Sequence, residues 1–154
     1  MRWIGPIIGT AGLYFMLVGL GLLPMPGGPQ NLHAPLWVLL LVGLAFFLAG
    51  ASMLIQVAGQ ANENGELPSG SPLWLRVMQY LMGVAIFATF GMIGSWIGLG
   101  AGPREFSGGI PFVGAAVNET IGRFAFGAGG IMCWLGALAF PVSGARKLYR
   151  RGKT

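Results

Sequence analysis

Glu119 and Arg123 lie four residues apart, in the most polar cluster beside any long apolar stretch of the chain. On a helix this spacing puts both side chains on one face, where they can pair. Asn118 is a good N-cap residue, and Glu119 would then lie in the first turn, where the helix dipole favours an anion. Alternatively, a helix that begins near Pro111 would carry both charges into the outer leaflet, where an ionisable pair marks a functional site. Capping is sufficient to explain the cluster, and the functional interpretation stays open.

Three further residues could join this pair in acid–base or recognition chemistry, namely His33, Arg104 and Glu105. A lone imidazole at a membrane interface titrates near neutral pH, but a functional role needs a carboxylate partner. If His33 and Glu105 converged with Glu119 and Arg123, they would suit a membrane enzyme that acts on a lipid or a quinone at the outer interface. The simpler interpretation of His33 is an interfacial residue before an apolar stretch.

Cofactor and metal chemistry find little support in the sequence. The chain has a single cysteine, Cys133, whereas thiol–disulfide chemistry requires a second one. One Cys and one His cannot supply the three or four ligands of a usual N/S metal site. The phosphate-loop, zinc-protease and serine-hydrolase motifs are missing from the sequence. We therefore expect no catalytic residue, no metal and no cofactor.

The elements that carry these residues follow from the composition. Of 154 residues, 55% are hydrophobic and 8% are charged, and Asp is absent. Soluble domains carry about 25% charged residues, and disordered chains are poor in apolar ones. These charges are too few to coat a soluble domain, so the sequence predicts an integral membrane protein.

Four apolar stretches are long enough to cross a bilayer, which takes about 20 residues. They cover residues 4–23, 36–58, 73–99 and 124–145, and their central parts contain no Asp, Glu, Lys, Arg or His. The short alternating pattern of membrane strands is missing. The sequence therefore predicts an all-α fold, with residues 1–154 forming one membrane domain of four transmembrane helices in an up-down-up-down bundle.

Basic residues predict the orientation. Residues 146–154 form a basic tail with five Lys and Arg, and Arg2 lies near the other terminus. Four spans put both termini on one side, which the positive-inside rule identifies as the cytoplasm. Trp3 and Trp74 then fall at inner ends and Trp37 and Trp96 at outer ends, whereas Trp134 lies in the middle of the fourth stretch.

The short tail suits orientation and contact with anionic lipid, so we expect no nucleic-acid partner. Arg outnumbers Lys, which hints at a GC-rich genome, and we expect the plasma membrane of a bacterium.

Glycine, with 28 copies, is the residue that predicts helix packing. Helices in lipid associate through small residues that let backbones approach, and spacings of four or seven keep such residues on one stripe. The packing candidates are Gly5, Gly9, Gly43, Gly50, Gly91, Gly94, Gly98 and Gly129. These stripes either close the four-helix bundle, or one of them docks another subunit. The stripe of the third stretch is the first candidate for such docking.

Three functions fit these observations. The first is a non-catalytic accessory or structural protein that acts through helix–helix contacts, in a larger membrane complex or with copies of itself. The second is a homo-oligomeric channel or transporter for a small uncharged or anionic solute, lined by Thr10, Thr89, Ser95 or backbone. The third is the membrane enzyme described above. The sequence favours the first, because it shows no catalytic motif and no charge in the centre of a span.

Overall fold

The computed structural model describes residues 3–25, 27–28, 34–68, 70–102 and 114–151. Within these residues the chain is all-α, without strands, and forms four helices: α1 (Ile4–Gly19), α2 (Leu36–Ala58), α3 (Leu73–Leu99) and α4 (Ala115–Arg151). Three segments are long and apolar enough to cross a membrane, namely α2, α3 and residues Ala116–Val142 of α4. This composition of the helices supports an integral membrane protein.

The helices α2 and α3 have the bounds that hydropathy predicts for the second and third apolar stretches. Pro35 and Pro72 precede their first residues. A proline suits the start of a helix, because the first N–H groups have no intrahelical acceptor.

The first helix is shorter than the predicted stretch 4–23, because the helical conformation ends at Gly19. Gly21 takes a left-handed conformation with φ of 73°, which favours glycine. The amide of Gly21 donates to the carbonyl of Val18 at 2.9 Å, and that of Leu22 donates to the carbonyl of Leu17 at 2.9 Å. These two bonds form a Schellman motif that ends the helix. The 16 residues of α1 extend about 24 Å, against a hydrocarbon layer of about 30 Å.

The fourth helix is longer than predicted at both ends, since residues 115–123 and 146–151 are helical as well. The carbonyl of Gly114 accepts the amides of Val117 and Asn118, both at 3.1 Å. Asn118 therefore lies inside the helix, and its prediction as the N-cap was wrong. The alternative prediction of a start near Pro111 is nearer the observed start at Ala115.

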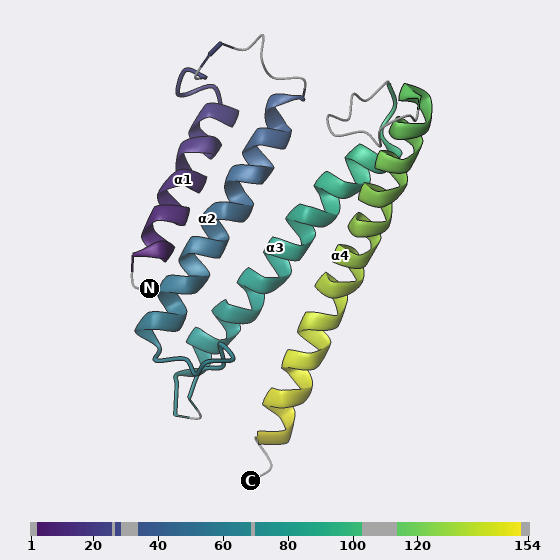
Figure 1. Cartoon of the computed structure of the whole chain (residues 1–154). Helices are drawn as coiled ribbons and strands as arrows, with labels where there is room; N and C mark the ends of the chain where they lie inside the picture. Colours follow the sequence, from purple (N-terminus) through teal and green to yellow (C-terminus); the bar gives the residue numbers. More distant parts are fainter. Residues whose placement is uncertain (1–2, 26, 29–33, 69, 103–113, 152–154) are drawn as a thin grey trace.

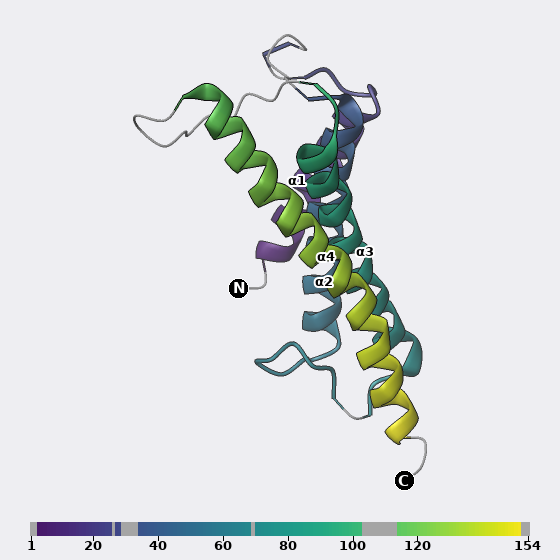
Figure 2. The same cartoon turned by 90° about the vertical axis from the view of Figure 1, so that its right-hand side faces the viewer.

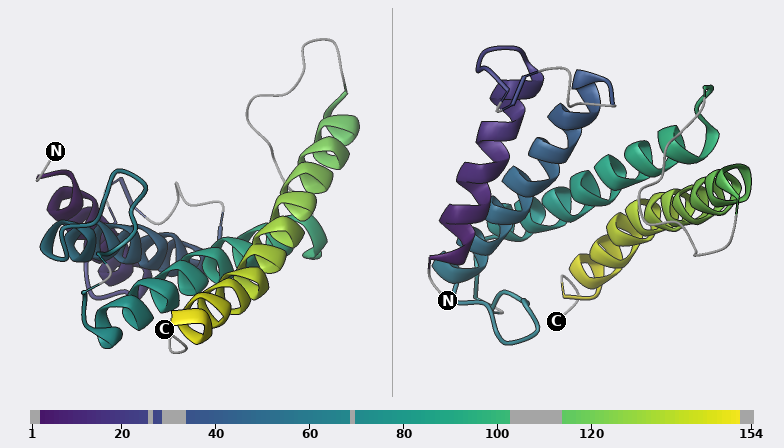
Figure 3. Two further views of the ribbon diagram at one scale, coloured as in Figure 1. Left: turned by 90° about the horizontal axis from the view of Figure 1, so that it is seen from below. Right: turned by 45° about the horizontal axis from the view of Figure 1, so that its top comes forward.

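The four helices lie in a row in which each is antiparallel to the next (Figure 1). The helix α1 packs on α2, α2 on α3, and α3 on α4, whereas no part of α1 described here contacts α4. Figure 3 shows α1 and α4 on opposite sides of the row, and Figure 2 shows α4 crossing α3 obliquely. Neighbouring helices therefore alternate in direction and form an open row of two hairpins, and the four-span bundle stays a prediction. We call the end where α1 begins and α4 ends, drawn at the bottom of Figure 1, the lower end.

The contact of α1 with α2 is a contact between backbones. A Cβ atom placed at Gly50 would lie 2.6 Å from the Cα of Gly9 and 2.7 Å from the carbonyl oxygen of Gly5. Cβ atoms at Gly12 and Gly43 would each lie within 2.8 Å of the other's carbonyl oxygen. Real Cβ atoms essentially never approach closer than 3.0 Å. The two helices can therefore adopt this separation only because these positions have no side chain.

The upper half of the α3–α4 contact has the same character. A Cβ atom at Gly94 would lie 2.8 Å from the Cα of Gly130, and one at Gly98 would lie 2.5 Å from the Cα of Gly127. The glycines of the third stretch thus face α4 of the same chain. Gly127 and Gly130, which supply the other side, were not among the predicted packing residues.

Toward the lower end of the α3–α4 contact, the glycines of one helix pack against aromatic rings of the other helix instead of against glycines. A Cβ atom at Gly83 would lie 2.8 Å from the ring of Phe140, and one at Gly136 would lie 3.0 Å from the ring of Phe87. Each helix thus offers a glycine to a ring of the other helix. The two phenylalanine rings also contact each other, with centroids 5.6 Å apart.

Trp134 belongs to the same α3–α4 contact. Its ring covers Gly91, where a Cβ atom would lie 3.0 Å from the indole, and its Nε1 donates to the Oγ of Ser95 at 3.1 Å. This hydrogen bond explains how Trp134 can lie in the middle of a span, because its indole N–H group has an acceptor there.

Two of the predicted packing glycines tolerate a side chain. A Cβ atom at Gly9 would make an ordinary contact of 3.8 Å with the Cα of Gly50. Gly129 has no described atom within 4 Å of such a position, because Gly127 and Gly130 define the side of α4 that meets α3. Within this chain Gly129 therefore lies outside the contact between α3 and α4, and its use against another subunit stays a prediction.

Candidate functional site

The described part of the predicted polar cluster connects α4 to the end of α3. The Nε of Arg123 donates to the Oε1 of Glu119 at 2.9 Å, and its Nη1 donates to the carbonyl oxygen of Gly100 at 2.8 Å. Its Nη2 donates to the carbonyl oxygen of Gly102. All three guanidinium nitrogens therefore have acceptors within the chain.

The geometry explains why a cation is placed here. Gly100 is the C-cap of α3, and the last carbonyl groups of a helix lack intrahelical partners. A guanidinium at this end satisfies such carbonyls and interacts favourably with the negative end of the helix dipole. The side chains of Arg123 and Glu119 are 26% and 29% exposed, so the polar medium that reaches them weakens the attraction between their charges.

The pair lies near the end of α3. The carbonyl oxygen of Arg123 lies 3.0 Å from the position that a Cβ atom of Gly98 would take, and α3 ends one residue later at Leu99. A role in fixing α4 to α3 accounts for the three contacts of the guanidinium with Glu119, Gly100 and Gly102.

The other predicted members of the cluster, His33, Arg104 and Glu105, lie outside the described residues. The structure therefore brings together Glu119 and Arg123 and does not test the larger constellation that an enzyme would need. Among the described residues, no three His, Cys, Asp or Glu side chains gather into a set that could hold a metal ion.

The three polar residues proposed as a pore lining have partners in the single chain. The hydroxyls of Thr10 and Thr89 donate to the carbonyls of Pro6 and Ala85 of their own helices, at 2.8 Å and 2.7 Å. Thr89 is 4% exposed, and Ser95 accepts the indole N–H described above. In this arrangement they contribute to the helices and to their packing.

A polar network at the lower end was not predicted from the sequence. In the loop between α2 and α3, the Oδ1 of Asn62 accepts the amides of Asn64 and Glu66, at 3.1 Å and 2.8 Å. The Nε2 of Gln79 in α3 donates to the carbonyl oxygen of Gly65 at 2.5 Å. The loop is thereby tied to itself and to α3. An Asn followed at short distance by Gly is a turn signal that could have indicated this order.

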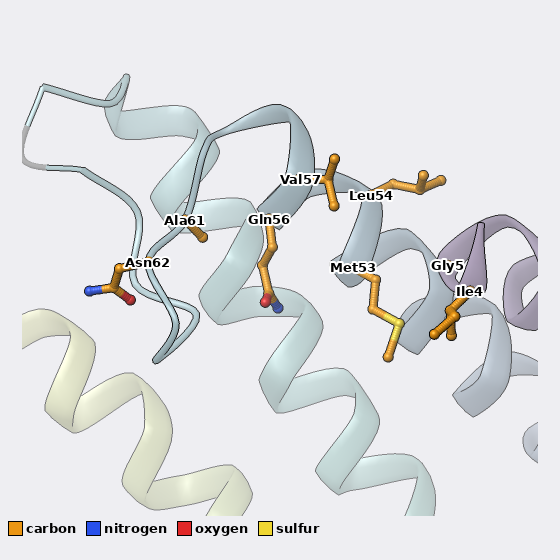
Figure 4. Close-up of a pocket in the computed structure, with 8 residues that line it drawn as sticks. All are labelled: Ile4, Gly5, Met53, Leu54, Gln56, Val57, Ala61 and Asn62. Carbon is orange, nitrogen blue, oxygen red and sulfur yellow. The ribbon is translucent and has the colours of Figure 1, made fainter. Parts of the chain in front are cut away.

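Beside this loop lies a partly open pocket of about 320 Å³ (Figure 4). The start of α1, the last turns of α2 and the loop after α2 form its wall. Its lining is mostly hydrocarbon, with two amide side chains, Gln56 and Asn62. No sequence motif indicated this pocket, since it arises from the different lengths of α1 and α2.

Comparison with known proteins yields no match to a family model, to a curated protein or to a solved structure.

Proposed function

We propose that the chain is a non-catalytic accessory or structural protein of the membrane, which acts through helix–helix contacts with a larger complex or with copies of itself. The observation that carries this proposal is the use of Arg123. The sequence singles out Arg123 as a candidate for chemistry, but its guanidinium donates to Glu119, Gly100 and Gly102 and so joins α4 to the end of α3. A group held in this way is suited to stabilising a scaffold.

The proposed orientation has four crossings and both termini in the cytoplasm of a bacterium. Support comes from the position of α1, which packs along the middle of α2, from Gly5 beside Met53 to Gly19 beside Leu40. If α2 crosses the bilayer, α1 therefore lies within the same layer despite its length. The basic residues near the two ends of the sequence agree with this orientation.

The side of α4 that faces away from α3 is the surface proposed for a partner helix. It carries large apolar side chains such as Met132, which is 68% exposed, and Ile121, which is 45% exposed, and both lie on the helical stripe of Gly129, three and eight residues away. Gly129 lies on α4 with open space in front of its Cα, so a helix could approach it closely.

The test is gentle extraction from the native membrane followed by mass spectrometry of the intact complex. We expect a larger membrane protein or copies of this chain to remain bound, and Gly129→Leu to release it without unfolding the chain. Gly114→Leu is the matched control, because Gly114 also has open space but precedes the first turn of α4. Identical assemblies for wild type and Gly129→Leu would contradict this surface, and a homo-oligomer that conducts solute in liposomes would favour a channel.

Reporter fusions to the two termini test the orientation separately. Both reporters should show cytoplasmic activity, and reporters on opposite sides of the membrane would refute four crossings.

A further inference from the structure

At the lower end, α2 extends beyond the first residues of α1, and we call the place beside α2 where α1 begins the step. Gly5, the second residue of α1, lies against Met53, since a Cβ atom at Gly5 would lie 3.2 Å from the Cβ of Met53. The helix α2 continues five residues further, to Ala58, which adds about 7.5 Å at 1.5 Å per residue. The step therefore lies within the segment of α2 that is apolar enough to cross a membrane.

The pocket of about 320 Å³ lies at this step, and its lining changes from apolar to polar along its length. Figure 4 shows Ile4 and Met53 at one end, Asn62 at the other and Gln56 between them. Val57, which also lines the pocket, is 49% exposed, so the pocket faces whatever surrounds α1 and α2.

A bilayer leaflet also changes from apolar at its centre to polar at its surface, in the same direction as the lining of this pocket. Hydrocarbon fills the space beside the middle of the helices, and the interfacial region with its ester and headgroup oxygens lies beside their ends. The volume is at the lower end of the usual range for ligand pockets, about 300–1,000 Å³, so it suits part of a lipid molecule. Ester oxygens accept hydrogen bonds, and a primary amide such as that of Gln56 or Asn62 has two N–H donors. The Nε2 of Gln56 donates one of its two to the Oγ of Ser52 at 3.3 Å.

We propose that this pocket binds one phospholipid, with an acyl chain against Ile4, Met53 and Val57 and the ester region toward Gln56 and Asn62. The lipid fills the step that the short α1 leaves beside α2. This binding site is independent of the partner surface proposed on α4, which lies at the other end of the row of helices.

The test uses the full-length protein in nanodiscs of phosphatidylethanolamine and phosphatidylglycerol, released in the mass spectrometer. The variant Val57→Trp fills the pocket with an indole. The matched control is Val142→Trp on α4, because Val142 is an equally exposed valine, 52% against 49%, away from the pocket. We expect wild type and Val142→Trp to retain one phospholipid, and the apparent affinity of Val57→Trp for that lipid to fall about tenfold, which corresponds to about 1.4 kcal/mol.

A second measurement needs no variant and therefore does not depend on the folding of Val57→Trp. A phospholipid with a photoreactive acyl chain is activated in nanodiscs with wild-type protein, and the labelled peptides are mapped. Labelling concentrated at the start of α1 and at the last turns of α2 supports the site. Equal labelling along the exposed side of α4, or equal lipid retention in wild type and Val57→Trp, would overturn it. A change from dimer to monomer in Val57→Trp, with lipid retention unchanged, would show an interface between copies and would also overturn it.

Discussion

The contact between Gly9 and Gly50 offers a sharp test of the packing, because the two glycines face each other but are not equivalent. A Cβ atom at Gly50 would have to move from 2.6 Å to at least 3.4 Å from the Cα of Gly9 before it reached ordinary contact distance. A Cβ atom at Gly9 would already make an ordinary contact, at 3.8 Å. Gly50→Ala must therefore push α1 away from α2, whereas Gly9→Ala fits in place.

The expected size follows from these distances. Forcing an extra methyl group into a packed contact costs about 1–3 kcal/mol. Replacing Gly by Ala inside a helix also gains up to about 1 kcal/mol in helix propensity, and this gain applies to both variants. The difference between Gly50→Ala and Gly9→Ala therefore isolates the steric cost, and we expect Gly50→Ala to be the less stable variant by about 1–3 kcal/mol.

Equilibrium unfolding in mixed micelles of a mild detergent and sodium dodecyl sulfate, followed by circular dichroism, measures this difference. Hydrogen exchange of the α1 amides gives a local readout, since α1 contacts α2 and no other helix among the described residues. Gly50→Ala should accelerate exchange throughout α1, and Gly9→Ala should not. Equal stability of the two variants, or faster exchange in Gly9→Ala, would refute the backbone contact.

Three further predictions concern the contact between α3 and α4. Gly98→Ala should destabilise the protein by about 1–3 kcal/mol in the same unfolding assay, because its Cβ would lie 2.5 Å from the Cα of Gly127, whereas Gly127→Ala, with its nearest contact at 3.6 Å, should be tolerated. Arg123→Met removes three hydrogen bonds and should cost about 1–3 kcal/mol, whereas Glu119→Gln, which weakens a partly exposed ion pair, should cost about 1 kcal/mol or less; equal losses would contradict the role of Arg123 at the end of α3. Trp134→Phe keeps a ring over α3 but removes the indole N–H donor, so a loss of about 0.5–1.5 kcal/mol is expected, and unchanged stability would show that the hydrogen bond contributes little.

Hydropathy predicts where the helices lie, but it predicts both ends correctly only for α2 and α3. In these two helices the apolar residues begin and stop where the helix does, and a proline precedes each of them. It extended α1 to residue 23, since Leu22 and Leu23 are as apolar as the residues before them, whereas the left-handed Gly21 ends the helix. It began the fourth helix too late, because Glu119 and Arg123 lower the hydropathy of a segment that forms a good helix.

The spacing of small residues predicts a helix face but does not identify the partner of that face. Gly94 and Gly98 were assigned to one stripe, yet only the structure places Gly127 and Gly130 opposite them and leaves Gly129 outside. Similarly, the pair Glu119–Arg123 follows from its spacing, whereas the acceptor Gly100, 23 residues away in the sequence, requires the tertiary fold. Contacts of this kind depend on how two helices are rotated and shifted, which local patterns do not determine.

The open row of two antiparallel hairpins bears on how the polypeptide is made. Each glycine-packed interface joins helices that are consecutive in the chain, α1 with α2 and α3 with α4. Contacts between nearby segments form quickly, because little loop-closure entropy is lost. The first hairpin can therefore assemble while the ribosome is still synthesising the third helix, and it need not wait for the carboxyl-terminal half of the protein to emerge.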